Sequence, residues 1–201
     1  MSFARYSSPS ALSRRAFLGA GAAMFAGVLV SGATAQELQF LHRRRPGLPG
    51  MGPSYRTEVA YAGGQPAGSI IIVAEARTLD LVLGAGRAYR YAISVGRDGF
   101  GWSGRVTVGA KKEWPEWRPP QEMRQRQPGL PELVPPGPYN PLGARALYLH
   151  RDGRDTLYRI HGTNDPQGIG FDNTSGCFRM TNTDIKELFD LVSLGATVDV
   201  L

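Results

Sequence analysis

The strongest constraint on the fold is a series of short apolar runs, separated by turn residues, that extends over most of the chain after residue 68. The runs have the lengths of strands, and several alternate apolar with polar residues, as in Leu79–Leu83. We predict strands at Ile70–Val73, Leu79–Leu83, Tyr89–Val95, Val106–Val108, Leu147–Leu149, Leu157–His161 and Thr197–Leu201. The pattern predicts a mainly β fold, built as a mainly antiparallel sandwich or barrel.

One helix is predicted near the C-terminus. Thr183 is a suitable N-cap, Asp184 stands in the first turn where the helix dipole favours an acid, and Gly195 ends the run. The apolar residues between them have the helical spacing i, i+3, i+4, i+7: Ile185, Leu188, Phe189 and Val192. We expect this helix to pack on the sheet.

A proline-rich segment interrupts the strand pattern. Residues 115–141 hold nine of the 15 prolines, which cannot donate to a strand ladder, so the segment is a long ordered loop, a linker or a disordered stretch. Strands are predicted on both sides of it, which excludes a domain boundary. We favour an ordered loop laid over the sheet beside the functional site, anchored by Trp114, Trp117, Met123, Leu130, Leu133 and Tyr139. A loop without function is the alternative, and the role of residues 111–143 stays open.

The N-terminus has the order of an export signal. Arg14-Arg15 precedes an apolar run of Gly, Ala and Val and then Ala33-Thr34-Ala35, so residues 1–35 are predicted to be a signal peptide. The paired arginines resemble a twin-arginine signal, and a general secretory signal is the alternative. The run is too short and too Gly-rich for a permanent membrane span. We expect a flexible lead-in at residues 36–67 and a periplasmic location for the mature protein.

Charge and cysteine content exclude several classes of protein. Three of the 23 basic residues lie in residues 1–35, which hold no acid, so the rest of the chain is only slightly basic and no nucleic-acid partner is expected. Cys177 is the only cysteine, which excludes an intrachain disulfide and a multi-thiolate metal site. The widely spaced His42, His150 and His161 form no recognisable metal site, so we expect no metal and no cofactor.

Two segments have the residue types of a thiol nucleophile and its base. His161 ends a predicted strand and is followed by Gly162, and Cys177 follows Gly176 in a predicted tight turn. A thiol becomes reactive when a base removes its proton or when an imidazolium stabilises the thiolate. Gly176 leaves nearby amides free to point at one spot, as an oxyanion hole requires. Arg179, two residues beyond the thiol, would project to the same side and could hold a substrate carboxylate.

The same residues lie in a longer pattern: His161-Gly162-Thr163-Asn164-Asp165-Pro166, Gly168-Ile169-Gly170 and Ser175-Gly176-Cys177-Phe178-Arg179-Met180-Thr181-Asn182. This pattern resembles the L,D-transpeptidase catalytic domain, or YkuD, family. The resemblance extends upstream to Thr107-Val108-Gly109 and to residues 135–147, ends at 195–200, and covers about residues 68–201. It implies a β-sandwich-like mixed β fold.

The resemblance also implies roles for individual residues. Cys177 is the implied nucleophile, His161 its general base, and the amides of Gly176 and Cys177 the oxyanion donors. Ser175 would support the turn, Arg179 would engage the donor peptide, and a carbonyl near Gly162 would orient the base.

The implied reaction cleaves the bond between diaminopimelate and the terminal D-Ala of a peptidoglycan tetrapeptide stem. A thioester forms on Cys177, and an amine attacks it to give a 3-3 crosslink. Water as acceptor would make the protein an L,D-carboxypeptidase, and a lysine of an envelope protein would make it an anchoring enzyme. A non-catalytic envelope-binding module is the alternative from a different class.

One departure from the family pattern stands out. Many members have Thr-Pro-x-Gly before a Phe-Thr-Val strand, whereas this chain has Gly101-Trp102-Ser103-Gly104 there. This difference affects the groove next to the predicted nucleophile.

Overall fold

The computed structural model describes residues 51–201, which form a mainly β fold as predicted. The predicted signal peptide, residues 36–50 of the lead-in and His42 lie outside the described residues. Nine strands form one mixed sheet in the order β1-β4-β3-β2-β11-β6-β7-β8-β10, and β5 and β9 form a second, two-stranded sheet. The strands are β1 Thr57–Ala60, β2 Ile70–Val73, β3 Thr78–Gly84, β4 Arg87–Ala92, β5 Val95–Gly96, β6 Gly104–Glu113, β7 Arg145–Arg151, β8 Arg154–His161, β9 Asp172–Thr174, β10 Phe178–Arg179 and β11 Thr197–Val200.

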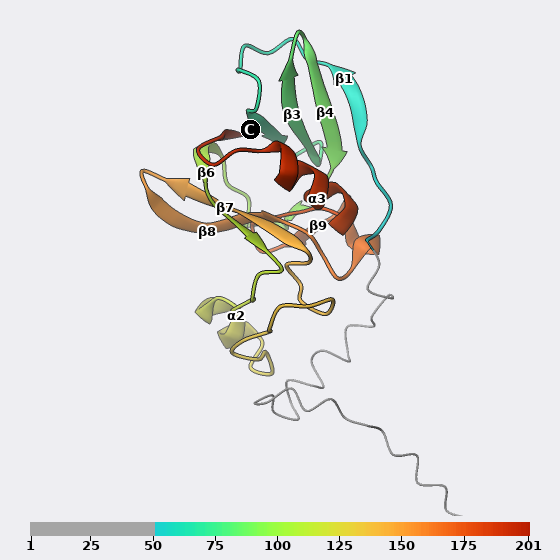
Figure 1. The fold of residues 1–201 in the computed structure, drawn as a ribbon. Helices are drawn as coiled ribbons and strands as arrows, with labels where there is room; N and C mark the ends of the chain where they lie inside the picture. The colour runs from blue at the N-terminus through green and yellow to red at the C-terminus, as the bar shows by residue number, and fades with distance from the viewer. Residues whose placement is uncertain (1–50) are drawn as a thin grey trace, which may run out of the picture. The chain divides into compact units, whose positions relative to one another are not determined.

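The C-terminal strand β11 joins the two halves of the large sheet. It pairs in parallel with β2 and antiparallel with β6, so that β1 to β4 lie on one side of it and β6, β7, β8 and β10 on the other. The β3–β4 hairpin lies in one half and the β7–β8 hairpin in the other (Figure 1). Most pairings are antiparallel, and the three parallel ones are β2–β11, β8–β10 and β5–β9.

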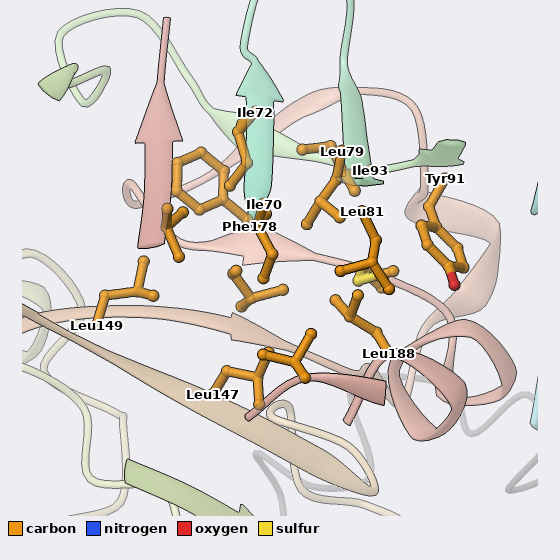
Figure 2. Close-up of a cluster of buried hydrophobic side chains, with 14 of the residues drawn as sticks. Ile70, Ile72, Leu79, Leu81, Tyr91, Ile93, Leu147, Leu149, Phe178 and Leu188 are labelled. Carbon is orange, nitrogen blue, oxygen red and sulfur yellow. The ribbon is translucent and has the colours of Figure 1, made fainter. Parts of the chain in front are cut away.

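Both halves of the sheet face a single hydrophobic core. Side chains from β2 and β3 meet side chains from β7 and α3 in one cluster, as Leu81, Leu147 and Leu188 show (Figure 2). Helix α3 covers this cluster from the side. Each fully buried aliphatic side chain stabilises the fold by about 1.5–3 kcal/mol. The arrangement is sandwich-like because one continuous sheet bends around the core.

The prediction that residues 36–67 are a flexible lead-in is wrong for the part that contains β1. Thr57–Ala60 pairs antiparallel with β4, from Thr57 opposite Arg90 to Ala60 opposite Arg87. Just before it, the Ser54 hydroxyl donates to Asp184 of α3 at 2.6 Å. The segment is short and lacks apolar alternation, so its pairing depends on an edge strand that is distant in sequence.

Helix α3 spans Asn182–Leu191, and its predicted N-cap Thr183 is wrong by two residues. Thr181 is the cap, and its hydroxyl accepts a hydrogen bond from the Asp184 amide at 3.1 Å. Thr183 is not the cap because it already lies inside the helix, where its hydroxyl donates to the Gly52 carbonyl at 2.7 Å. The helix ends before Gly195. The Lys111 ammonium donates to the carbonyls of Phe189 and Val192 at this end of the helix.

The proline-rich segment is ordered and contains a short helix, α2 Gln121–Arg126, which the sequence did not predict. Trp117 and Val134 exchange backbone hydrogen bonds of 2.8 and 2.9 Å across the segment. Prolines keep their carbonyl acceptors but have no N–H donors, so the segment is short of backbone donors. The Asn140 side chain supplies donors to these carbonyls. Its amide nitrogen lies 2.9–3.0 Å from three carbonyl oxygens, of Pro115, Val134 and Pro135.

Of the helices within residues 51–201, none has the length and apolar character needed to cross a bilayer.

Candidate active site

The register of β8 and β10 brings the two predicted site segments together. The strands run in parallel with Arg179 opposite His161 and Phe178 opposite Ile160. Strands β9 and β10 were not predicted, since each has only two or three residues. Paired residues of neighbouring strands point to the same face of a sheet, and neighbours along a strand alternate.

The alternation places Cys177 and His161 on one face. Phe178 and Ile160 are buried in the core, so Cys177, Arg179 and His161 project from the opposite face. Strand spacing and rise put the Cα atoms of Cys177 and His161 about 8 Å apart. A thiol and an imidazole from adjacent strands can meet across this separation.

His161 is held as a neutral imidazole. Its side chain is buried, and Nδ1 lies 2.6 Å from the Gly162 carbonyl oxygen, the position where the family resemblance implies a base-orienting carbonyl. A carbonyl only accepts, so the ring proton is on Nδ1 and the lone pair is on Nε2. Burial, helped by the positive charge of Arg179, lowers the pKa of His161 to about 3. The imidazole is therefore unprotonated at neutral pH.

Asn182, which the sequence analysis did not single out, fixes the chain around the base. Its side-chain oxygen accepts from the amides of Ala144 (2.9 Å) and Thr163 (3.1 Å), and its nitrogen donates to the Thr163 carbonyl at 2.8 Å. A Cβ on Gly162 or Gly143 would overlap this side chain. The close approach explains why glycines stand at both positions. Asn182 belongs to the quoted family pattern, but only the fold shows its partners.

Thr174, and not the predicted Ser175, holds the turn at Cys177. Its hydroxyl donates to the Cys177 carbonyl at 2.6 Å and accepts from the Gly176 amide at 3.3 Å. The Gly176 N–H therefore points into the turn, contrary to its predicted place beside the Cys177 N–H in an oxyanion hole. Within residues 51–201, the Cys177 N–H has no acceptor. Gly176 has a φ of +100°, and a Cβ there would overlap the Tyr158 ring.

Cys177 rests as a neutral thiol. Burial raises its pKa above the ordinary value, and the Arg159 amide together with the charges of Arg159 and Arg179 offsets part of that shift. The sulfur lies 4.0 Å from the carbonyl oxygen of Leu157, whose side chain is 70% exposed at the rim of the site. Because the His161 imidazole is neutral, the thiol fits the first of the two activation routes, in which the base removes the proton during attack.

Arg179 lies in the site with its backbone and side chain both held. Its amide and carbonyl exchange hydrogen bonds with Ser94, and its guanidinium donates to the Asn173 side chain at 2.7 Å. The acid Asp172 forms a bidentate ion pair with Arg77 at 2.7 Å. The positive charge of Arg179 is near enough to lower the pKa values of both Cys177 and His161.

The proline-rich loop borders this site. The guanidinium of Arg126 in α2 lies over the Phe100 ring at 5.0 Å, and the Phe100 carbonyl oxygen lies where a Cβ on Gly176 would be in close contact. Tyr139 of the loop accepts at its carbonyl from Asn164 at 2.8 Å, shortly after the base. No group of three His, Cys, Asp or Glu residues in the part of the chain that the structure describes is placed to hold a metal ion.

A thiol and a neutral imidazole on one face of adjacent strands are the arrangement of enzymes that use a cysteine nucleophile. The model of the L,D-transpeptidase catalytic domain family, YkuD, matches residues 67–200. The chain belongs to this family.

Three similar proteins illustrate the match. A probable L,D-transpeptidase ErfK/SrfK of Escherichia coli is 42% identical over 114 residues, which are 51% of this chain and 35% of that protein. A crystal structure from Brucella melitensis, described as a probable carnitine operon oxidoreductase, is 43% identical with a TM-score of 0.50 and covers 73% of this chain and 92% of that one. An Enterococcus faecium L,D-transpeptidase mutant has a TM-score of 0.52 at 18% identity, covers 68% and 50%, and shows a common fold.

Proposed function

We propose that the protein is a cysteine L,D-transpeptidase that acts on peptidoglycan tetrapeptide stems. The observation that carries the proposal is the parallel register of β8 and β10, which puts Cys177, His161 and Arg179 on one face. The Escherichia coli relative described above is named as a probable L,D-transpeptidase. This chain spans 35% of that relative's length.

The proposed first half-reaction forms a thioester. Nε2 of His161 takes the thiol proton while Cys177 Sγ attacks the carbonyl carbon of diaminopimelate, and the Cys177 N–H donates to the oxygen that becomes negative. Collapse of the tetrahedral intermediate breaks the peptide bond. D-Ala leaves as an amine with the proton from His161, and the acyl group stays on sulfur.

The second half-reaction releases the acyl group to an acceptor. His161 takes a proton from the acceptor amine, the new amide bond forms, and the C–S bond breaks to restore the thiol. A diaminopimelate amine would give a 3-3 crosslink, water would give a tripeptide, and a lysine of an envelope protein would give an anchored protein. Arg179 is proposed to hold a carboxylate of the donor stem.

Export fits this substrate. The paired arginines and the apolar run within residues 1–35 support a signal peptide and a periplasmic location, with the twin-arginine route preferred. Fractionation of cells that make the full chain, with Arg14→Lys and Arg15→Lys together, tests the route: loss of the exported form supports twin-arginine export, and normal export points to the general pathway.

One other function is less well supported. A non-catalytic envelope-binding module has no need for a neutral buried histidine aligned with a thiol.

A purified-protein experiment tests the proposal. The chain is mixed with a tetrapeptide stem, and the intact mass is followed. An adduct of the tripeptide acyl group is expected on the wild type and none on Cys177→Ala. An adduct that persists in Cys177→Ala, or its absence from the wild type, overturns the proposal. Muropeptides of a deletion strain then identify the acceptor.

A further inference from the structure

We propose that Trp102 is a positioning residue for the nucleophile: its indole aims the Cys177 amide at the oxyanion of the transition state. This inference rests on the proposed acyl transfer. Trp102 lies in the 101–104 segment where the chain departs from the Thr-Pro-x-Gly pattern of many family members.

The indole N–H is directed at the nucleophile turn. Trp102 Nε1 donates to the Gly176 carbonyl oxygen at 3.1 Å. The Trp102 ring stacks on Tyr158, with centroids 4.7 Å apart and planes 19° apart, and packs on Phe178 at 5.6 Å. Phe178 follows Cys177 directly, and the Tyr158 ring lies against Gly176. Two aromatic neighbours therefore fix the indole next to the turn.

The geometry of the peptide bond transmits this contact to Cys177. The Gly176 carbonyl and the Cys177 N–H belong to one planar trans unit, in which they point in opposite directions. A donor on the carbonyl therefore sets the direction of the N–H, which points away from the indole. The hydrogen bond from Thr174 to the Cys177 carbonyl holds the next peptide unit in the same way.

The same hydrogen bond strengthens the amide as a donor. A donor at the carbonyl oxygen polarises the peptide unit, and hydrogen bonds in series reinforce one another. Because the Gly176 N–H is directed to Thr174, the Cys177 N–H is the backbone donor of this turn that is left for the oxyanion within residues 51–201. Its direction is then decisive for stabilising the developing negative charge.

The expected effect is large enough to measure. Removing an oxyanion donor outright lowers the rate roughly 10²–10³-fold. Loss of the bond that only aims the donor should lower the acylation rate roughly 10-fold, because the amide can still sample the productive orientation.

The test compares two reactions of Cys177 in Trp102→Phe. Acylation by p-nitrophenyl acetate passes through a tetrahedral oxyanion, whereas alkylation by iodoacetamide is a direct displacement without one. We expect acylation to fall roughly 10-fold and alkylation to stay within about twofold. Trp114→Phe, in the proline-rich loop, is the matched control and should leave both rates unchanged. Equal loss in both reactions, or no loss in either, overturns the proposal.

A second variant covers the case in which Phe disturbs packing. Benzothienylalanine at position 102 keeps the shape of the indole and replaces its N–H by sulfur, so the aromatic contacts stay. The same selective loss of acylation supports the proposal, and wild-type acylation overturns it. The ester probe also separates this inference from the proposed function. If the wild type reacts with the ester but not with the tetrapeptide, the proposed peptidoglycan substrate is contradicted. The comparison of acylation and alkylation rates still tests the role of Trp102.

Discussion

The two sides of the active site are built differently. The base side, around His161, is locked by buried hydrogen bonds from one side chain, Asn182, to the backbone. The nucleophile side, around Cys177, is held by the Thr174 hydroxyl and by the indole of Trp102, which comes from a separate loop. The base side is thus fixed by fully buried polar contacts, whereas the nucleophile side depends on a partly buried ring at the edge of the core. Changes on the first side should reduce stability and activity together, and changes on the second mainly activity.

The largest effect on the base side is expected from His161→Gln. Loss of a general base lowers the rate roughly 10²–10⁴-fold, and the neutral thiol has no other proton acceptor of this kind among the described site residues. The rate of acyl-adduct formation with the tetrapeptide, followed by mass spectrometry, measures it. His150→Gln, at a half-buried histidine outside the site, should change the rate less than about twofold. Equal rates in the two variants would remove His161 from the reaction.

Asn182→Ala should show the coupling of stability and activity on the base side. It leaves two buried amides and one carbonyl without their partner, and each unsatisfied group costs about 1–3 kcal/mol, so we expect a loss of at least about 3 kcal/mol in the free energy of unfolding. Urea denaturation measures it. Asn173→Ala, at an exposed asparagine, should lose less than about 1 kcal/mol. Similar stabilities of the two variants would contradict a buried clamp.

Thr174→Val should act on the nucleophile side with little effect on stability. Valine keeps the shape but removes the hydroxyl that donates to the Cys177 carbonyl, so acylation should fall about tenfold and the free energy of unfolding by about 1 kcal/mol. Thr183→Val removes a comparable hydroxyl bond at α3 and is the control, with a similar stability change and an unchanged rate. If acylation falls equally in both, the turn has no special dependence on Thr174.

The buried His161 should also lower the stability of the fold in acid, by a small amount for each pH unit. Its pKa is about 3 in the folded protein and about 6.5 when unfolded, so below pH 6.5 the unfolded chain binds the extra proton and stability falls as the pH falls toward 3. One such group contributes at most about 1.4 kcal/mol per pH unit. Unfolding of the wild type and His161→Gln between pH 7 and 4 should give a steeper loss in the wild type. Parallel curves would mean that the imidazole is not neutral in the fold.

Much of the fold could be predicted from local patterns. Runs of β-branched and apolar residues indicated β2, β3, β4, β6, β7, β8 and β11, and the helical spacing from Ile185 to Val192 indicated α3. The strand predicted at Tyr89–Val95 is divided in the structure between β4 and β5. The strands that were missed, β1, β9 and β10, have two to four residues each and exist through pairing with distant partners. The missed helix α2 lies among prolines, in a loop stabilised by the Asn140 side chain.

The site was predictable as residue types but not as contacts. His161 and Cys177 stood out through their neighbours Gly162 and Gly176, whereas Thr174, Asn182 and Trp102 carry no local signal of their roles. Each acts on backbone groups that only the fold brings near. The assignment of a turn-supporting role to Ser175 was one residue off because hydroxyl direction depends on a turn whose dihedral angles cannot be read from the residue types.

The central position of β11 has a consequence for how the protein is made. Thr197–Val200 follow every other strand along the chain, yet they lie between β2 and β6 and link the two halves of the sheet. During synthesis, β2 therefore cannot pair with β11 until more than a hundred further residues have been made. We expect this high contact order to make folding slow and to leave the edges of β2 and β6 open until translation of the last strand is complete, which gives helper proteins an interval in which to bind the nascent chain.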